Sequence, residues 1–279
     1  MKIVQITDTH LSHLGGVSNE NFQQLARFIN DQLRPDVVVH SGDILILNPD
    51  NDADRAAAKQ ALNLIDAPLY VVPGNHDVGE PGEHPWAGIA ATSARTKAHI
   101  DAFGPDSWVH IVGDYAIVGF NSEIIGAGIP EEQEQWQWLD TVPEKVAGRP
   151  TLVFCHKPLW QPTIEEPVHT LNIPAQFTER LLGVFNQVPV KAYGSGHVHI
   201  YAQGKHADAL TISAPSTAFL AKGAIDLPVL EQLGVVEYIC ENGNVEAYFR
   251  SIPTLVEGDP REIPEFNAAL AELGITLEV

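Results

Sequence analysis

The chain has 279 residues, of which 44% are apolar and 19% charged, as is typical of a globular protein with a sizeable core. Its 36 acidic and 16 basic side chains give a net charge of −20, which argues against duplex DNA, RNA and anionic membranes as partners. Two cysteines are too few for a disulfide framework, and no signal peptide or membrane-spanning run is evident, so we expect a cytoplasmic protein.

The first third of the chain alternates short hydrophobic strands with amphipathic helices. Hydrophobic runs predict strands, and apolar residues at helical spacing predict helices, in the order strand 2–7, helix 19–33, strand 36–40, helix 53–65 and strand 69–72. Each strand runs into polar residues that can bind a metal ion, namely Asp8, His10, Asp43, Asn75 and His76. This alternation indicates an α/β architecture with sites at the carboxyl ends of strands.

The remainder of the chain continues the pattern and closes with paired strands. The predicted elements are helices at 90–103, 130–140, 175–185 and 263–273, a hairpin at 108–121 and strands at 151–155, 190–193, 209–213, 235–240 and 245–250. Two of these strands lead into further histidines, His156 and the pair His197 and His199. Because no repeat, low-complexity tract or linker interrupts the chain, we interpret residues 1–279 as a single domain.

The histidine pair lies in the stretch Gly-Ser-Gly-His-Val-His at residues 194–199. In an extended segment His197 and His199 would project to the same side, because side chains alternate along a strand. Two imidazoles without a nearby thiol suit a borderline divalent metal ion such as zinc, manganese, iron or cobalt. Most of the 12 histidines of the chain must be ordinary surface or core residues, so the pair is informative only together with ligands elsewhere.

The strand-end residues offer more ligands than one metal ion needs. Carboxylate oxygen, amide oxygen or imidazole nitrogen is available from seven of them: Asp8, His10, Asp43, Asn75, His156, His197 and His199. A single zinc ion takes three or four ligands, whereas seven mixed nitrogen and oxygen ligands fit a site for two ions. The sequence therefore predicts a dinuclear metal site.

Five motif blocks in order resemble the calcineurin-like metallophosphoesterase family. They are Asp8-Thr9-His10, Gly42-Asp43, Gly74-Asn75-His76-Asp77, His156 and Gly196-His197-Val198-His199. The resemblance implies a four-layer αββα sandwich of two mixed sheets and the hydrolysis of a phosphoester bond. It also implies that Asp8, His10 and His199 hold one metal ion, that Asn75, His156 and His197 hold a second, and that Asp43 bridges the two. A hydroxide between two ions about 3.5–4 Å apart is a strong nucleophile toward phosphorus.

Two residues beside the ligand Asn75 are expected to act in catalysis. His76 resembles a family residue that contacts the phosphate and protonates the leaving group, with a supporting structural role as the alternative. Asp77 would fix the tautomer of His76 by accepting a hydrogen bond from its other ring nitrogen.

Several other side chains are interpreted as packing, or left between packing and substrate contact. His40 in its valine-rich strand, Cys155 on the strand face opposite His156, and the helical Trp136 and Trp138 are predicted to be structural. Five aromatic residues in loops beside the motifs are expected either to line a substrate pocket or to pack, namely His13, His84, Trp86, Trp160 and His169.

Within the family, the motifs look most like those of small bacterial cyclic-nucleotide phosphodiesterases, although Lys157 stands where that branch often has proline or histidine. We therefore expect a small phosphodiester substrate, with a phosphomonoesterase or a nucleotide or lipid-precursor hydrolase as the alternative. A non-catalytic scaffold is disfavoured because no ligand is missing. The motifs lie within residues 1–205, and residues 206–279 are expected to complete a sheet and to cap the pocket or form a homodimer contact.

Overall fold

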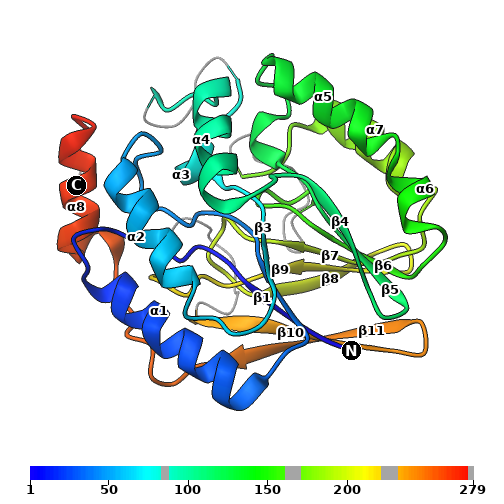
Figure 1. Cartoon of the computed structure of the whole chain (residues 1–279), viewed down its shortest axis with the longest axis horizontal. Helices are drawn as coiled ribbons and strands as arrows, with labels where there is room; N and C mark the ends of the chain where they lie inside the picture. The colour runs from blue at the N-terminus through cyan, green and yellow to red at the C-terminus, as the bar shows by residue number, and fades with distance from the viewer. Residues whose placement is uncertain (83–87, 161–170, 221–231, 276–279) are drawn as a thin grey trace.

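A computed structural model describes residues 1–82, 88–160, 171–220 and 232–275. Two mixed β-sheets lie in the middle of the molecule, and helices flank them (Figure 1). The α/β class and the pair of mixed sheets predicted from the sequence are confirmed. Among the described residues, no helix combines the length and the apolar character needed to cross a membrane.

The first sheet has five strands in the order β11-β10-β1-β2-β3. Its strands are β1 (Lys2–Ile6), β2 (Val37–His40), β3 (Leu69–Val71), β10 (Gly234–Glu241) and β11 (Asn244–Ser251). The strands β1, β2 and β3 are parallel, whereas β10 runs antiparallel to β1 and to β11. The carboxyl ends of β1, β2 and β3 therefore meet at one edge of the molecule.

The second sheet has six strands in the order β4-β5-β6-β7-β9-β8. Its strands are β4 (Trp108–Val112), β5 (Tyr115–Gly119), β6 (Thr151–Phe154), β7 (Val190–Ser195), β8 (Ala202–His206) and β9 (Ala209–Ser213). The inner strands β5, β6, β7 and β9 are parallel, and the two outer strands are antiparallel to their neighbours.

Apolar side chains pack the two sheets face to face. Val39 and Tyr238 from the first sheet share one buried cluster with Ile117 and Leu152 from the second. The polar side chain of Gln5 also lies between the sheets, where it donates to the Ser41 hydroxyl and the Ser195 carbonyl and accepts from the Tyr238 hydroxyl. The inner layers of the predicted sandwich are thus joined by burial of apolar surface and by satisfied polar contacts.

Helices cover the outer face of each sheet. The helices of the described residues are α1 (Val17–Phe28, continued as a π-helix over Ile29–Leu33), α2 (Asp52–Leu62), α3 (Asn75–Val78), α4 (Ser93–Phe103), α5 (Pro130–Leu139), α6 (Val142–Val146), α7 (Ala175–Phe185) and α8 (Pro264–Glu272), with 3₁₀ turns at Ser122–Ile124 and Pro260–Glu262. Phe22 and Leu25 of α1 cluster with Val4 of β1, whereas Leu139 of α5 clusters with Val153 of β6. Together with the inner cluster, these contacts make four layers in the order helix, sheet, sheet, helix.

The sequence-based elements agree with the structure except for short or polar segments. The predicted helix at 19–33 is an α-helix that ends as a π-helix, and Arg34 closes it in a left-handed conformation. The strand β8 was not predicted because it is a polar edge strand with alternate residues exposed. The single turn α3 and the short α6 were also missed, since neither is long enough to show a helical period.

Candidate metal centre

The seven predicted ligands follow the carboxyl ends of five strands, β1, β2, β3, β6 and β7. Asp8 and His10 follow β1, Asp43 follows β2, Asn75 begins α3 just after β3, His156 follows β6, and His197 and His199 follow β7. The first three strands belong to one sheet and the other two to the second sheet. The structure brings the residues of these loops together at one edge of the sandwich.

One group of ligand atoms consists of Asp8, His10 and His199, whose atoms all lie within 4.8 Å of one another. Nε2 of His199 lies 3.2 Å from Oδ1 of Asp8 and 3.1 Å from Nε2 of His10. All three residues are buried. Their arrangement has the size and the mixed nitrogen and oxygen donors expected of a transition-metal site.

A second group consists of Asp43, His156 and His197, again within 4.8 Å. Nε2 of His156 lies 3.3 Å from Oδ2 of Asp43 and 3.1 Å from Oδ1 of Asn75. Asp43 also forms a close group with His10 and His76. It therefore lies between the ligands of the first group and those of the second, as a bridging carboxylate must.

The orientation of three imidazoles shows that the groups suit a cation. Nδ1 of His156 lies 2.8 Å from the Ser41 carbonyl, Nδ1 of His199 lies 3.0 Å from the Phe219 carbonyl, and Nδ1 of His10 faces the Ile46 carbonyl. Each Nδ1 is thus placed to donate a proton, which leaves the Nε2 lone pair directed into the site. These lone pairs face one another and carboxylate or amide oxygens, an arrangement of acceptors that requires a positive charge between them.

The charge balance of the site supports the same conclusion. Burial lowers the pKa of His156, but Asp43 and Asp8 raise it, to about 10 overall. Burial and the neighbouring His76 and His199 lower the pKa of His10 to about 3. In the described part of the chain, the buried Oδ1 of Asp8 accepts no hydrogen bond. The carboxylates therefore attract a cation at the Nε2 positions, and a divalent metal ion satisfies them better than a single proton.

The predicted side-by-side projection of His197 and His199 is wrong. Strand β7 ends at Ser195, and both histidines have left-handed backbone angles, with φ of 73° and 57°. The two rings therefore point to different groups, His199 to Asp8 and His197 to Asp43. Asp8, His10 and Asp43 also have positive φ, between 46° and 54°. Such conformations are uncommon for residues with a Cβ and concentrate at functional sites.

Two motif glycines are required by close packing around the carboxylates. A Cβ added at Gly74 would overlap the side chain of Asp43, and one added at Gly196 would overlap the Thr7 hydroxyl and approach Asp8 Oδ2 to 2.7 Å. The backbone amide of His197 donates to the same Asp8 oxygen, and that of His76 donates to Asp43. The glycines thus allow backbone segments to approach and orient the ligands.

Asp77 has a different partner from the one predicted. Its carboxylate accepts from the backbone amides of Ile44, Leu45 and Gly74 at 2.9–3.2 Å. The carbonyl of Ile46, 2.8 Å from Nδ1 of His76, takes the place expected for Asp77. Asp77 therefore joins the loop after β2 to the turn that carries Asn75, because three amides there need an acceptor. His76 lies at the edge of the site, with its side chain 12% exposed and Nε2 3.8 Å from Asp43 Oδ2.

Residues in the segment after β9 also support the site and were missed in the sequence. Phe219 stacks on the ring of His10, with centroids 4.6 Å apart, and its carbonyl accepts from His199. The hydroxyl of Ser216 donates to the carbonyl of Asp8 at 2.9 Å. No motif marks this Ser-Thr-Ala-Phe stretch, because its role depends on one ring, one hydroxyl and one backbone carbonyl.

Most side chains that were predicted to be structural are buried, in the apolar core or in a hydrogen bond. His40 is buried, with Nε2 2.9 Å from the Thr9 hydroxyl, and Cys155 and Trp136 lie in the outer core of the second sheet. Of the five loop aromatics, His84, Trp86 and His169 lie outside the described residues. His13 pairs with Asp54 at 2.7 Å, and Trp160 stacks on His206 with centroids 4.1 Å apart.

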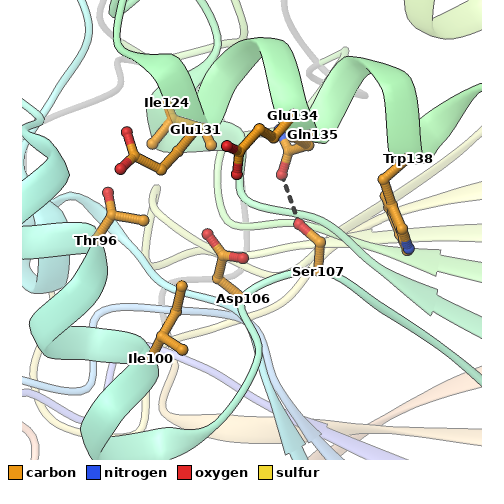
Figure 2. Close-up of a pocket in the computed structure, with 9 residues that line it drawn as sticks. All are labelled: Thr96, Ile100, Asp106, Ser107, Ile124, Glu131, Glu134, Gln135 and Trp138. Carbon is orange, nitrogen blue, oxygen red and sulfur yellow. Dashed lines mark hydrogen bonds between the residues drawn. The ribbon is translucent and has the colours of Figure 1, made fainter.

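A separate cavity of about 180 Å³ lies between α4 and α5. Its lining includes Asp106, Glu131 and Glu134 together with Trp138, and Figure 2 shows these carboxylates spread around the opening. In the described ranges, groups of three acidic, histidine or cysteine side chains with ligand atoms within 4.8 Å occur only at the strand ends. The acidic cavity therefore lacks the close grouping that distinguishes the strand-end site.

Comparison with known proteins identifies the family of this chain. A family model described as calcineurin-like phosphoesterase matches residues 1–201. A probable glycerophosphodiester phosphodiesterase, GpdQ, from Arcobacter nitrofigilis is 28% identical over 71% of this chain and 72% of its own length. The serine/threonine-protein phosphatase CPPED1 of Danio rerio is 30% identical over 66% of this chain, and the match covers only 60% of that protein.

A solved structure shares the fold. The purple acid phosphatase PPD1 from yellow lupin (Lupinus luteus) seeds superposes with a TM-score of 0.66 at 14% identity, covering 93% of this chain and 52% of that one. At this identity the likeness concerns the fold alone. The family model covers the segment that carries all seven predicted ligands, of which six lie in adjoining close groups and Asn75 lies beside His156. The chain therefore belongs to the calcineurin-like phosphoesterase family.

Proposed function

We propose that this protein is a two-metal phosphodiesterase that hydrolyses small phosphodiesters. The observation that carries the proposal is the convergence of imidazole Nε2 lone pairs and carboxylate oxygens in two adjoining groups, which Asp43 connects because it belongs to the second group and also lies close to His10 of the first. When bound, two metal ions would offset the charge of the phosphoryl oxygens and activate a water molecule for attack on phosphorus. Asp8, His10 and His199 would hold one ion, Asn75, His156 and His197 the other, and Asp43 would contact both.

His76 is proposed to serve the leaving group. Its ring lies beside Asp43 and is more exposed than those of the buried His10 and His156. Because Nδ1 faces the Ile46 carbonyl, Nε2 is the atom at which this ring takes up a proton and delivers it to the departing oxygen. The loop after β2 thus positions both the bridging carboxylate and the ring of the proposed general acid.

The preference for a diester rests on sequence similarity and on charge. The relative from Arcobacter nitrofigilis is named as a probable glycerophosphodiester phosphodiesterase and aligns over about equal shares of both chains. A net charge of −20 favours substrates of low negative charge, and a diester carries one charge where a monoester carries up to two. Glycerophosphodiesters and 3′,5′-cyclic nucleotides are both small diesters, and we propose them as the first substrates to test.

Phosphomonoester hydrolysis is the second candidate function. It is favoured by the similarity to CPPED1 of Danio rerio, which is named as a serine/threonine-protein phosphatase. The same metal groups would serve either reaction, because both need an activated water and charge neutralisation at phosphorus. A non-catalytic scaffold is disfavoured, since all seven ligand positions are occupied by residues able to bind metal.

The test is a metal-supplemented comparison of substrates. Chelator-treated protein is incubated with Mn²⁺, Zn²⁺, Co²⁺ or Fe²⁺ and assayed on bis(p-nitrophenyl) phosphate, p-nitrophenyl phosphate, a glycerophosphodiester and cyclic nucleotides. We expect metal-dependent turnover with a larger kcat/KM for a diester, and loss of that turnover in Asp43→Asn. A larger kcat/KM for the monoester would support the second candidate. Absence of both turnover and metal binding would refute both enzyme proposals.

A further inference from the structure

Lys157 is a buried cation held between two carboxylates beside the candidate metal centre. Its Nζ lies 3.2 Å from Oε1 of Glu80 and 3.5 Å from Oε2 of Glu123. All three residues are buried, and Glu123 is completely inaccessible to solvent. A buried ammonium is retained only where carboxylates compensate its lost hydration, so the positions of the three side chains depend on one another.

Two of the three side chains, Lys157 and Glu80, come from segments that carry predicted ligands of the second metal ion. Lys157 directly follows His156, and Glu80 follows the α3 turn that begins at Asn75. Glu123 lies in the 3₁₀ turn after β5, where the neighbouring Ser122 hydroxyl lies 3.2 Å from the backbone N of His156 and 2.9 Å from that of Lys157. One ammonium therefore connects the backbone that presents His156 to the backbone that presents Asn75.

The first group of ligands has a different support. Phe219 stacks on His10 and binds His199 through its carbonyl, while Ser216 binds the carbonyl of Asp8. These residues belong to the segment after β9, far along the chain from Lys157. The two groups of metal ligands are thus oriented by two separate sets of neighbours.

We propose that Lys157 is a positioning residue for the second metal ion, holding Asn75 and His156 at the separation that ligation requires. The proposal rests on the proposed two-metal function. Two carboxylates around one ammonium leave one net negative charge near this group, which favours a divalent cation there. Lys157, which stands where the cyclic-nucleotide branch often has proline or histidine, thus has a role of its own.

The proposal predicts a selective change in metal binding. Lys157→Met should weaken the second metal ion by roughly 10–100-fold, the usual effect of losing a residue that orients a ligand, and leave the first unchanged. Glu80→Gln keeps a one-to-one pair between Lys157 and Glu123 while removing the charged contact to the Asn75 segment, and should weaken the same ion less. Lys157→Arg retains the cation and should recover part of the affinity. Lys97→Met, which removes an exposed lysine paired with Asp101, is the matched control.

The experiment is a Mn²⁺ titration in which calorimetry measures the number of ions bound and their affinities. Electron paramagnetic resonance shows whether the bound ions form a coupled pair. Wild type and Lys97→Met should bind two ions and show the exchange-coupled signal of a metal pair. At a Mn²⁺ concentration that fills both sites of wild type, Lys157→Met should have only its first site filled. It should therefore bind one ion and show the signal of isolated Mn²⁺. Equal weakening of both ions, or two ions bound as in wild type, would overturn the proposal. If Lys157→Met does not fold, Glu80→Gln decides by the same criterion. A wild type that binds no metal would refute the two-metal function itself.

Discussion

The imidazoles of His10, His156 and His199 are oriented in the same way. In each, a backbone carbonyl faces Nδ1, so that Nε2 points into the site. Because the carbonyl fixes both the ring angle and the tautomer, little reorganisation is needed when a metal ion binds. The Nδ1 of His76 faces a carbonyl in the same way, yet the ring lies nearer the solvent. The three buried rings are therefore suited to metal binding, whereas the more exposed ring of His76 is suited to proton transfer.

The role of His76 can be tested by truncation. His76→Ala should leave two metal ions bound and reduce kcat by roughly 10²–10⁴-fold, the range for loss of a general acid. The loss should be smaller for a diester whose leaving group is p-nitrophenolate, because a good leaving group needs little protonation. Metal content by elemental analysis and kcat on two diesters of different leaving-group pKa provide the measurement. A fall in metal content would show instead that His76 is a ligand, as its closeness to Asp43 and His10 allows.

His99 predicts a pH dependence of stability away from the metal centre. It is buried in α4, and among the described residues neither ring nitrogen has a hydrogen-bond partner. Burial and the nearby Arg55 lower the pKa of His99 to about 3. Below about pH 6.5 the unfolded chain binds a proton here that the folded chain does not bind until about pH 3. Stability is therefore lost as the pH falls through this window, by at most about 1.4 kcal/mol per unit for this residue.

Replacing His99 with leucine removes this proton-linked loss. With metal chelated from both proteins, His99→Leu should lose less stability than wild type between pH 7.5 and pH 5, by on the order of 1–2 kcal/mol. Urea unfolding at the two pH values measures the difference, and the value at pH 7.5 serves as the baseline for any change in packing. Equal losses in both proteins would contradict a buried, uncharged His99.

At the scale of elements, the site lies where the backbone turns sharply just after the ends of the strands. Asp8, Asp43 and His199 have positive φ, and the loops approach one another closely enough that Gly74 and Gly196 cannot carry a side chain. The strands that precede these residues are packed into the buried apolar clusters of the sandwich. The predicted ligands therefore lie only a few residues beyond the strands of the sheets. This placement fixes their relative positions more accurately than a long loop would.

The segment after β9 gives a prediction at this scale. Phe219 stacks on His10, and Phe266 of α8 packs edge-on against Phe219 with centroids 5.6 Å apart. Phe219→Leu keeps the backbone carbonyl that orients His199 but removes the flat surface beneath His10. We expect the first metal ion to bind about 10-fold more weakly and the second to be unchanged, the reverse of the Lys157 variants. The same Mn²⁺ titration measures both, and weakening of only the second ion would contradict this assignment.

Helices and strands with a clear apolar period, and the motif residues, could be predicted from the sequence. The backbone conformations and contacts that orient the motif residues could not. Helix α7 matches its prediction residue for residue, because a long apolar period with a terminal proline defines it. The loop conformation of His197 and the acceptor role of Asp77 could not be predicted, since both depend on where other segments run. Phe219 carries no motif, so only the packed structure reveals its contact with His10.

At the scale of the whole molecule, each group of metal ligands draws on both sheets. Asp8 and His10 follow a strand of the first sheet, while His199 follows a strand of the second. Asp43 and His156 are divided in the same way. The apolar layer between the sheets already joins them, and each metal ion would add a link at the edge where that layer ends. Metal binding is therefore expected to affect the stability of the whole sandwich rather than of one loop.

This linkage gives a quantitative expectation for metal removal. An ion that binds only the folded chain stabilises it by about 2.7 kcal/mol per site at 100 times its Kd, so two independent sites would add roughly twice that amount. We expect Mn²⁺ to raise the Tm of chelator-treated protein by on the order of 10 °C, given the sensitivity of chains of this size. Asp43→Asn should show only a small rise at the same Mn²⁺ concentration, because its single bridge serves both ions. Calorimetry should give one transition for wild type with and without metal, since both sheets contribute ligands. A metal-dependent shift in only part of the unfolding transition, or an equal rise in Asp43→Asn, would contradict the linkage of the two sheets through the site.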